Sequence, residues 1–210
     1  MKIRQKPPEK VWIDFQALVQ ASPRQLEQFQ KYADYLMDMN ELFNLTAITE
    51  LSGVVRQHFE DSLALAKFVD MSGIKTIADV GTGAGFPAIP LKIMYPHLKV
   101  ILIEVTKKKQ EFLANVIDLL GLENVEICDM DWRTFVRHPQ YEIDYFITRA
   151  ALDEVELGRA FRNGCSYNKA TLVYWVSKDW ECSPKVAPLV KRIEAYRLGN
   201  KDRRLVFMGL

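Results

Sequence analysis

The sequence has few of the residues that would support a disulfide framework or a structural metal site. Its three cysteines are isolated and form no Cys-x-x-Cys pair, so we expect free thiols in a reducing compartment. The three histidines are too far apart for the ligands of a structural zinc. No run of about 18 apolar residues is present, and the N-terminus lacks the apolar core of a secretory signal. We expect a cytoplasmic protein without membrane contacts, and a monomer.

What is present is the balance of an ordinary globular chain. Its 210 residues, of which 49% are hydrophobic, suit one domain with a small extension, and a core of that size needs no disulfide or metal. The net charge is only +1, but basic residues gather in the first ten residues, at Lys107–Lys109, and from Lys185 to the end. Such patches indicate local polyanion binding, although solvated surface faces are the commoner explanation.

From about Glu9 to Asp70 the sequence shows helical periodicity. Ser22 is suited to cap a helix, and Pro23 to occupy its first turn. The apolar stripe of this helix consists of Leu26, Phe29, Ala33, Leu36 and Met37. A further helix is predicted over residues 51–69.

From residue 73 to residue 210, short β-rich runs alternate with helical segments. The predicted strands are residues 75–80, 99–104, 124–128, 143–148, 170–176, 193–198 and 204–208. The segment 106–121 has a strongly amphipathic helical pattern closed by Gly121. This alternation predicts an α/β fold with a mostly parallel sheet. The last two strands are separated by a short gap and are expected to form an antiparallel hairpin.

A glycine-rich loop follows the first predicted strand, at the edge where parallel sheets bind ligands. Glycines stand at alternate positions, Gly81, Gly83 and Gly85, after a strand that ends with Asp79 and Val80. They allow positive φ angles and close approach of the backbone to a ligand. A dinucleotide fingerprint would need a glycine at Phe86, and no Gly-Lys-Ser/Thr follows, so neither nucleotide-binding pattern is matched.

An acid at the end of the second predicted strand adds to this pattern. Glu104 can accept two hydrogen bonds from the hydroxyls of a ribose. The loop follows an acid and offers no positively charged residue that could bind a pyrophosphate. This suits a cofactor that has an ammonium group and a ribose but little phosphate. We interpret the loop as an S-adenosylmethionine site. A nicotinamide nucleotide or a purely structural turn remain alternatives.

Four segments narrow the interpretation: NELFNLTAITE (40–50), HFEDSL (58–63), DVGTGAGFPAIP (79–90) and KKKQEFL (107–113). Together they resemble the ribosomal RNA small subunit methyltransferase G family, also called GidB. The resemblance implies a Rossmann-like class I methyltransferase fold, with a mostly parallel seven-stranded sheet and helices on both faces. It also implies an N-terminal helical extension (1–72) before the S-adenosylmethionine-binding methyltransferase domain (73–210).

The resemblance implies S-adenosylmethionine-dependent methylation of guanine N7 in 16S ribosomal RNA, in the decoding-region loop of the small subunit. The expected cofactor-binding residues are Asp79, Gly81, Gly83, Gly85, Phe86, Glu104, Trp132, Arg133 and Arg149. Arg149 is also the candidate catalytic residue, because from a strand end it would hold the target nucleotide. Trp132 lies where an adenine could stack. The family usually has an acid at the position of Arg133, so Asp129 or Asp131 is expected to meet the adenine amino group instead.

Guanine N7 carries no proton, so its methylation needs positioning and electrostatics rather than a general base. The basic clusters would contact RNA phosphates. His58 and Asp61 share a helix face and either line an active-site rim or dock the extension on the sheet as a buried pair, which we favour. The alternative functions are a cofactor-binding ribosome-assembly factor with little transferase activity, a methyltransferase of another substrate class, and a nicotinamide-dependent oxidoreductase.

Overall fold

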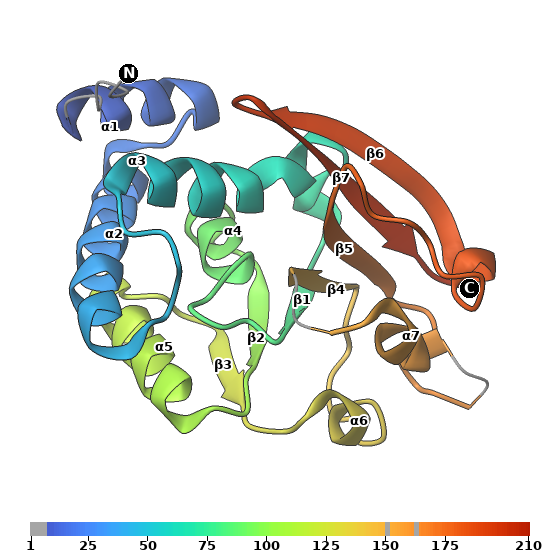
Figure 1. Ribbon diagram of the computed structural model, residues 1–210. Coiled ribbons are helices and arrows are strands. Elements are labelled where there is room, and N and C mark those ends of the chain that lie inside the picture. The colour runs from blue at the N-terminus through green and yellow to red at the C-terminus, as the bar shows by residue number, and fades with distance from the viewer. Residues whose placement is uncertain (1–7, 150–151, 162–163) are drawn as a thin grey trace.

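The computed structural model describes residues 8–149, 152–161 and 164–210, and these form a seven-stranded sheet flanked by helices (Figure 1). The strand order is β3-β2-β1-β4-β5-β7-β6, in which β1 to β5 are parallel and β7 is antiparallel to both of its neighbours. The strands are β1 (Thr76–Val80), β2 (Lys99–Ile103), β3 (Val125–Cys128), β4 (Tyr145–Arg149), β5 (Thr171–Ser177), β6 (Val190–Leu198) and β7 (Lys201–Met208). The predicted α/β fold and the final antiparallel hairpin are confirmed.

The two hairpin strands begin earlier than the sequence predicted, at Val190 and Lys201. Leu198 pairs with Lys201, so the connection is a tight turn at Gly199, whose φ is 59°. Strand β6 lies at the edge of the sheet and is exposed along most of its length. Because an edge strand is solvated and tolerates charged side chains on both faces, no apolar pattern marks where it begins.

The N-terminal helices are α1 (Pro8–Val19) and α2 (Pro23–Phe43). The predicted start of α2 is confirmed, because Ser22 accepts a hydrogen bond from the Gln25 backbone and the Gln25 side chain bonds back to Ser22. The helix ends at Asn44, which adopts the left-handed conformation with φ 49°. These local signals lie in the sequence itself, so the boundaries of α2 were predictable.

The segment after them is helical but irregular, which corrects the prediction of one helix over residues 51–69. It consists of α3 (Leu51–Val54), a π-helical stretch η1 (Val55–Glu60) and a 3-10 stretch η2 (Leu63–Lys67). In η1 the backbone carbonyl of Gln57 accepts a hydrogen bond from Arg149, which comes from β4. A carbonyl satisfied from outside the helix favours such a widened turn, and π turns often occur at functional sites.

The other helical elements connect the strands and cover both faces of the sheet. They are η3 (Met71–Gly73), α4 (Ala88–Met94), α5 (Lys107–Leu120), α6 (Trp132–Phe135), α7 (Glu154–Leu157), η4 (Gly158–Phe161) and η5 (Ala187–Leu189). Helix α5 ends at Gly121, at φ 58°, as predicted. Within the described ranges, no helix is long and apolar enough to cross a membrane.

Two apolar clusters hold the sheet between these helices. One cluster packs the N-terminal helices, α4 and α5 on one face of the sheet. Its largest buried rings include Phe15, Phe29 and Phe59. The other joins α6, α7 and η4 to the opposite face. Figure 1 shows this division, with α2, α4 and α5 gathered away from α6 and α7. The helical extension therefore packs directly on the sheet, beside the glycine loop.

Candidate active site

The three loop glycines between β1 and α4 have different surroundings. All adopt positive φ: 66° at Gly81, 61° at Gly83 and 95° at Gly85. A Cβ on Gly85 would lie 2.5 Å from a side-chain carbon of Ile89 and 2.7 Å from the Tyr32 hydroxyl, so Gly85 serves close packing. A Cβ on Gly83 would meet no atom closer than the Gly81 carbonyl at 4.0 Å. Gly83 therefore faces open space that a ligand can occupy.

Asp79 fastens the loop to the helix that follows it. Its side chain is fully buried, and its Oδ2 accepts hydrogen bonds from the Thr82 hydroxyl (2.7 Å) and from the backbone N–H of Ala88 (3.0 Å). Its Oδ1 has no hydrogen-bond partner among the residues that the structure describes. A buried acceptor without a partner is costly, so this atom is suited to a donor that arrives with a ligand or a water.

Glu104 holds the loop from the side of β2. Its Oε2 accepts a hydrogen bond from the backbone N–H of Gly83 (3.1 Å), and its Oε1 accepts one from Thr106 at the start of α5 (2.9 Å). The side chain is only 6% exposed, with the Lys109 ammonium 3.9 Å from Oε2. A carboxylate has about four acceptor sites, so Glu104 can still receive hydrogen bonds from a ligand.

Phe86 ties the loop to the helical extension. Its ring stacks on His58, with 4.4 Å between centroids, and on Tyr32, with 5.4 Å between centroids. The Tyr32 hydroxyl donates to the loop carbonyl of Ala84. Because only 6% of Phe86 is exposed, the ring acts mainly as a packing contact and presents little surface to a cofactor. The shape of the loop thus depends on residues of α2 and η1.

Arg149 leaves the end of β4 and crosses to η1. Its guanidinium donates to the Gln57 carbonyl (2.8 Å), to Asp61 Oδ2 (3.1 Å) and to His58 Nδ1 (2.8 Å). The guanidinium carbon lies 5.4 Å from the centroid of the Phe86 ring. Arg149 therefore links the glycine loop, through Phe86, to the π-helical stretch.

Asp61 is the centre of a buried polar network that includes Arg149. Its Oδ2 also accepts from Arg203 (3.0 Å) and its Oδ1 from the Tyr196 hydroxyl (2.5 Å), while its backbone carbonyl accepts from Trp175 (2.9 Å). Strands β4, β5, β6 and β7 are thereby all fastened to the helical extension. The predicted docking role is confirmed for Asp61, although its link to the predicted partner His58 runs through Arg149.

The protonation state of His58 follows from its partners. Arg149 can only donate, so Nδ1 of His58 is an acceptor and Nε2 carries the proton, which it donates to the Thr46 hydroxyl (2.8 Å). Burial and, next, the Arg149 guanidinium lower the pKa of His58 from 6.5 to about 3. The imidazole is neutral with both nitrogens engaged, so it is not available as a general base.

Asp79 and His58 give the folded state opposite responses to pH. Burial raises the pKa of Asp79 from 3.8 to about 7, against the lowering effect of its two hydrogen bonds. The folded state thus binds a proton at Asp79 more tightly, and a proton at His58 more weakly, than the unfolded chain does. As the pH rises from about 5 to about 7, the contribution of Asp79 to the free energy of unfolding therefore falls and that of His58 rises. Each contribution changes by up to about 1.4 kcal/mol per pH unit.

Single substitutions should separate these two opposed slopes. Relative to the wild type, we expect the free energy of unfolding of Asp79→Asn to rise between about pH 5 and pH 7, because only the stabilising effect of rising pH at His58 remains. We expect that of His58→Gln to fall over the same interval, because the slope of Asp79 remains. Urea titrations at both pH values measure the difference, and parallel profiles for the three proteins would contradict the opposed shifts.

Trp132 and Arg133 do not present side chains to the loop. The Trp132 ring is 4% exposed, packs against Phe135 and Phe146, and donates its N–H to the Glu156 carbonyl (2.7 Å). The predicted adenine stacking on Trp132 is therefore wrong, since the ring points into the core. The Arg133 guanidinium instead pairs with the Glu156 carboxylate, with 3.0 Å between Nε and Oε2.

The two acids that were expected at the adenine amino group differ in their surroundings. Asp131 caps α6, and its carboxylate accepts hydrogen bonds from the Thr134 backbone and hydroxyl, both at 3.0 Å. Asp129 is exposed and follows β3 directly, beside Glu104, whose backbone N–H donates to the Cys128 carbonyl. Asp129 is therefore the better placed of the two, and its contact with an adenine stays a prediction.

The residues of the site that were missed in the sequence include Tyr32, Tyr196 and, as a partner of Asp61, Arg203. Tyr32 lies three residues after Phe29, so helical spacing could have placed it on the same stripe. Alternation along β7 sets Arg203 on the same face as Leu205, which is buried. No local signal connects Tyr196 to Asp61, because their contact spans 135 positions.

A family comparison accounts for the combination of loop, acids and arginine. The family model described as rRNA small subunit methyltransferase G matches residues 25–177, which include the glycine loop, Glu104, Asp61 and Arg149. The chain belongs to this family. Curated methyltransferase G relatives match as well. That of Bacillus subtilis (strain 168) is 43% identical over 132 residues, which cover 63% of this chain and 55% of the relative.

A second methyltransferase G relative, from Leuconostoc citreum (strain KM20), is 47% identical over 106 residues, covering 50% of this chain and 44% of the relative. The chain thus spans about half the length of the curated relatives it matches. Among solved structures, a mutant of MtNAS in complex with S-adenosylmethionine has a TM-score of 0.55 and 16% identity, over 95% of this chain and 84% of that one. TrmN from Thermus thermophilus has a TM-score of 0.56 and 14% identity, over 74% of this chain and 53% of TrmN. At these identities the similarity concerns the fold alone.

Proposed function

We propose that the chain binds S-adenosylmethionine at the glycine loop. The backbone of Gly81 and Gly83 would receive the methionine portion, in the open space beside Gly83. The unpartnered Oδ1 of Asp79 would receive the ammonium group through a water, and Glu104 the ribose hydroxyls. Membership of the methyltransferase G family, and the fold shared with a solved structure that holds S-adenosylmethionine, support this assignment.

We further propose that the chain methylates guanine N7 in 16S ribosomal RNA, in the decoding-region loop of the small subunit. When bound, S-adenosylmethionine supplies an electrophilic methyl group: the N7 lone pair forms the new bond as the carbon–sulfur bond breaks, and the base gains positive charge. Because N7 carries no proton, the chain has to position the base and stabilise charge, and no proton acceptor is required.

The observation that carries this proposal is the position of Arg149. It touches the glycine loop through Phe86 and also lines a cavity at the ends of β4 and β5. The titratable groups beside it, His58 and Asp61, are occupied by hydrogen bonds. Among the described residues that contact Arg149, no base is free, and this suits N7 better than an exocyclic amine, from which a proton would have to be removed.

The small ribosomal subunit or its RNA is the partner that this reaction requires. The substrate would place the protein in the cytoplasm, and we propose that it acts as a monomer. The cluster Lys107–Lys109 at the start of α5 would contact RNA phosphates, since α5 begins beside Glu104 at the proposed cofactor site. The predicted N-terminal basic segment falls largely outside the described residues.

The test uses small subunits that lack 7-methylguanosine. The protein is incubated with methyl-labelled S-adenosylmethionine and these subunits, and label in 16S ribosomal RNA is measured beside cofactor affinity. We expect label in the RNA. Cofactor binding without any transfer would favour the assembly-factor alternative, and the absence of cofactor binding would overturn the assignment of the loop.

A further inference from the structure

A cavity of about 520 Å³ opens beside the glycine loop. It lies at the carboxyl ends of β4 and β5, between η1 and the β6–β7 hairpin, and its walls include His58, Asp61, Arg149 and Trp175. Arg149 borders it and also contacts Phe86, so the cavity and the glycine loop share a wall. Its size is typical of a small-ligand site.

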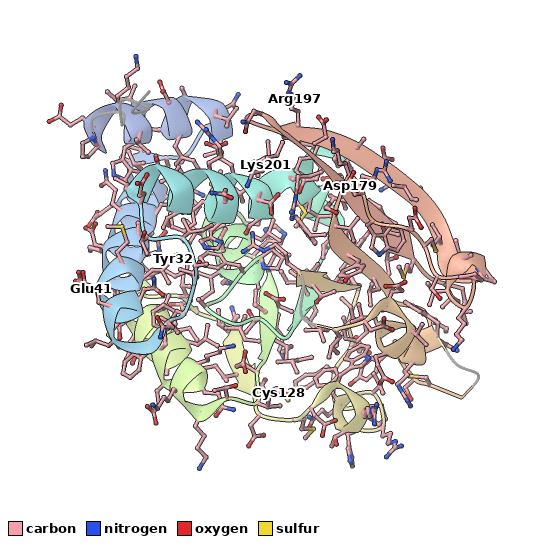
Figure 2. All side chains as sticks on the ribbon, viewed as in Figure 1. Tyr32, Glu41, Cys128, Asp179, Arg197 and Lys201 are labelled. Carbon is pink, nitrogen blue, oxygen red and sulfur yellow. The ribbon has the colours of Figure 1, made fainter. Side chains whose placement is uncertain are left out.

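The cavity is cationic and aromatic. Arg149, Arg203 and Lys201 contribute three positive charges to its lining, while Asp61 supplies one negative charge that both guanidiniums already contact. Figure 2 shows Lys201 near the turn of the hairpin, beside η1, and the Lys201 ammonium lies 2.8 Å from the side-chain oxygen of Gln57. The rings of Tyr174, Trp175 and Trp180 complete the lining. Such a lining suits a planar ligand that carries acceptor atoms and negative charge.

Two donors in this lining have no acceptor. The Nε1–H of Trp180 and the Nε–H of Arg203 are buried, and neither has a hydrogen-bond partner among the residues described. The Trp180 ring stands edge-on to Tyr174, with 6.3 Å between centroids at 90°. A buried donor without a partner is destabilising, so two of them in one cavity point to a ligand that brings acceptors.

We propose that this cavity holds the acceptor guanosine nucleotide, and that Trp180 and Arg203 recognise it; the inference rests on the proposed function. The Trp180 ring packs against the face of the base and its in-plane Nε1–H donates to the phosphate, while the Nε–H of Arg203 donates to guanine O6. Adenine carries an amino group in place of O6, so the donor that meets O6 disfavours it. Both residues lie beyond residue 177, where the family match ends, so the family comparison does not assign them.

The first test measures nucleotide binding directly and does not depend on methyl transfer. Saturation-transfer NMR is recorded on the full chain with S-adenosylhomocysteine and guanosine 5′-monophosphate. We expect signal on guanine H8 that exceeds the signal for adenosine 5′-monophosphate and that weakens strongly in Trp180→Ala. Trp12→Phe, which alters an aromatic residue of α1 outside the cavity, is the matched control and should bind as the wild type does. Equal signals from the two nucleotides, or no change in Trp180→Ala, would overturn the inference.

The second test separates this inference from the proposed function. We expect Trp180→Ala to raise the KM for undermethylated subunits by about tenfold, the factor expected for one lost base–aromatic contact, with unchanged cofactor affinity. Trp180→Phe keeps a ring and should recover most of the loss, and Arg203→Lys should raise the same KM. If the wild type transfers methyl groups and all three variants keep its KM, the cavity assignment fails while the function stands. If the wild type transfers none, the function fails and this assignment with it.

Discussion

Replacing Asp61 with alanine is expected to lower the free energy of unfolding by about 3 kcal/mol, a loss typical of removing one partner from a buried ion pair. The side chain is 3% exposed and faces two guanidiniums, those of Arg149 and Arg203, which are 14% and 24% exposed. Without the carboxylate, both positive charges and the Tyr196 hydroxyl lose their shared acceptor. The same change should loosen Arg149, so methyl transfer should fall as well.

Equilibrium urea unfolding at neutral pH measures this effect. Asp61→Asn, which keeps one acceptor oxygen, should be intermediate between alanine and the wild type. Glu27→Ala removes a carboxylate from an exposed pair with Lys31 and serves as the control, for which we expect no measurable loss. Equal stability of Asp61→Ala and Glu27→Ala would contradict the role of Asp61 as the link between the extension and the sheet.

Replacing Gly83 with alanine should weaken S-adenosylmethionine binding by about a hundredfold, the scale of effect that about 1 Å of misplacement causes in a pre-organised site. The new Cβ would enter the space proposed for the methionine portion. It would also strain a residue at φ 61°, at a cost of roughly 1–2 kcal/mol. Strain and obstruction therefore act together at this position.

Gly121→Ala isolates the contribution of strain. Gly121 has φ 58° and, as at Gly83, an added Cβ would meet no atom closer than 4.0 Å, but Gly121 ends α5 away from the loop. The two variants should lose similar stability in thermal unfolding, and only Gly83→Ala should lose cofactor affinity in isothermal titration calorimetry. Unchanged affinity in Gly83→Ala would show that the cofactor does not use this space.

The parts of the fold that were predictable are those encoded locally. The capping box of Ser22 and Gln25, the left-handed Gly121 and the apolar strand runs act within a few residues, so the elements and their order could be derived from the sequence. The π-helical stretch was not predictable, because it involves a carbonyl that Arg149 satisfies from 92 positions away. Local spacing placed His58 and Asp61 on one helix face, but it did not indicate that both would bond to Arg149.

The candidate site shows the same division. The acids at Asp79 and Glu104 and the loop between them lie where strand ends and glycine spacing predict. The predicted stacking of an adenine on Trp132 was wrong. The family motif gives the position of this residue along the chain, but not the aromatic packing that turns its ring into the core. The cavity lined by Trp180 and Arg203 was not predictable, because it forms only when the β6–β7 hairpin folds back beside η1 (Figure 1).

The most direct test of the central claim is the position of the methyl group on the RNA. Undermethylated small subunits are treated with the protein and S-adenosylmethionine, the 16S RNA is digested, and the modified nucleoside is identified and mapped by mass spectrometry. We predict a single 7-methylguanosine in the decoding-region loop, with much less formed by Gly83→Ala at limiting S-adenosylmethionine. Methylation of an exocyclic amine or of a ribose hydroxyl, or label on protein alone, would contradict the account.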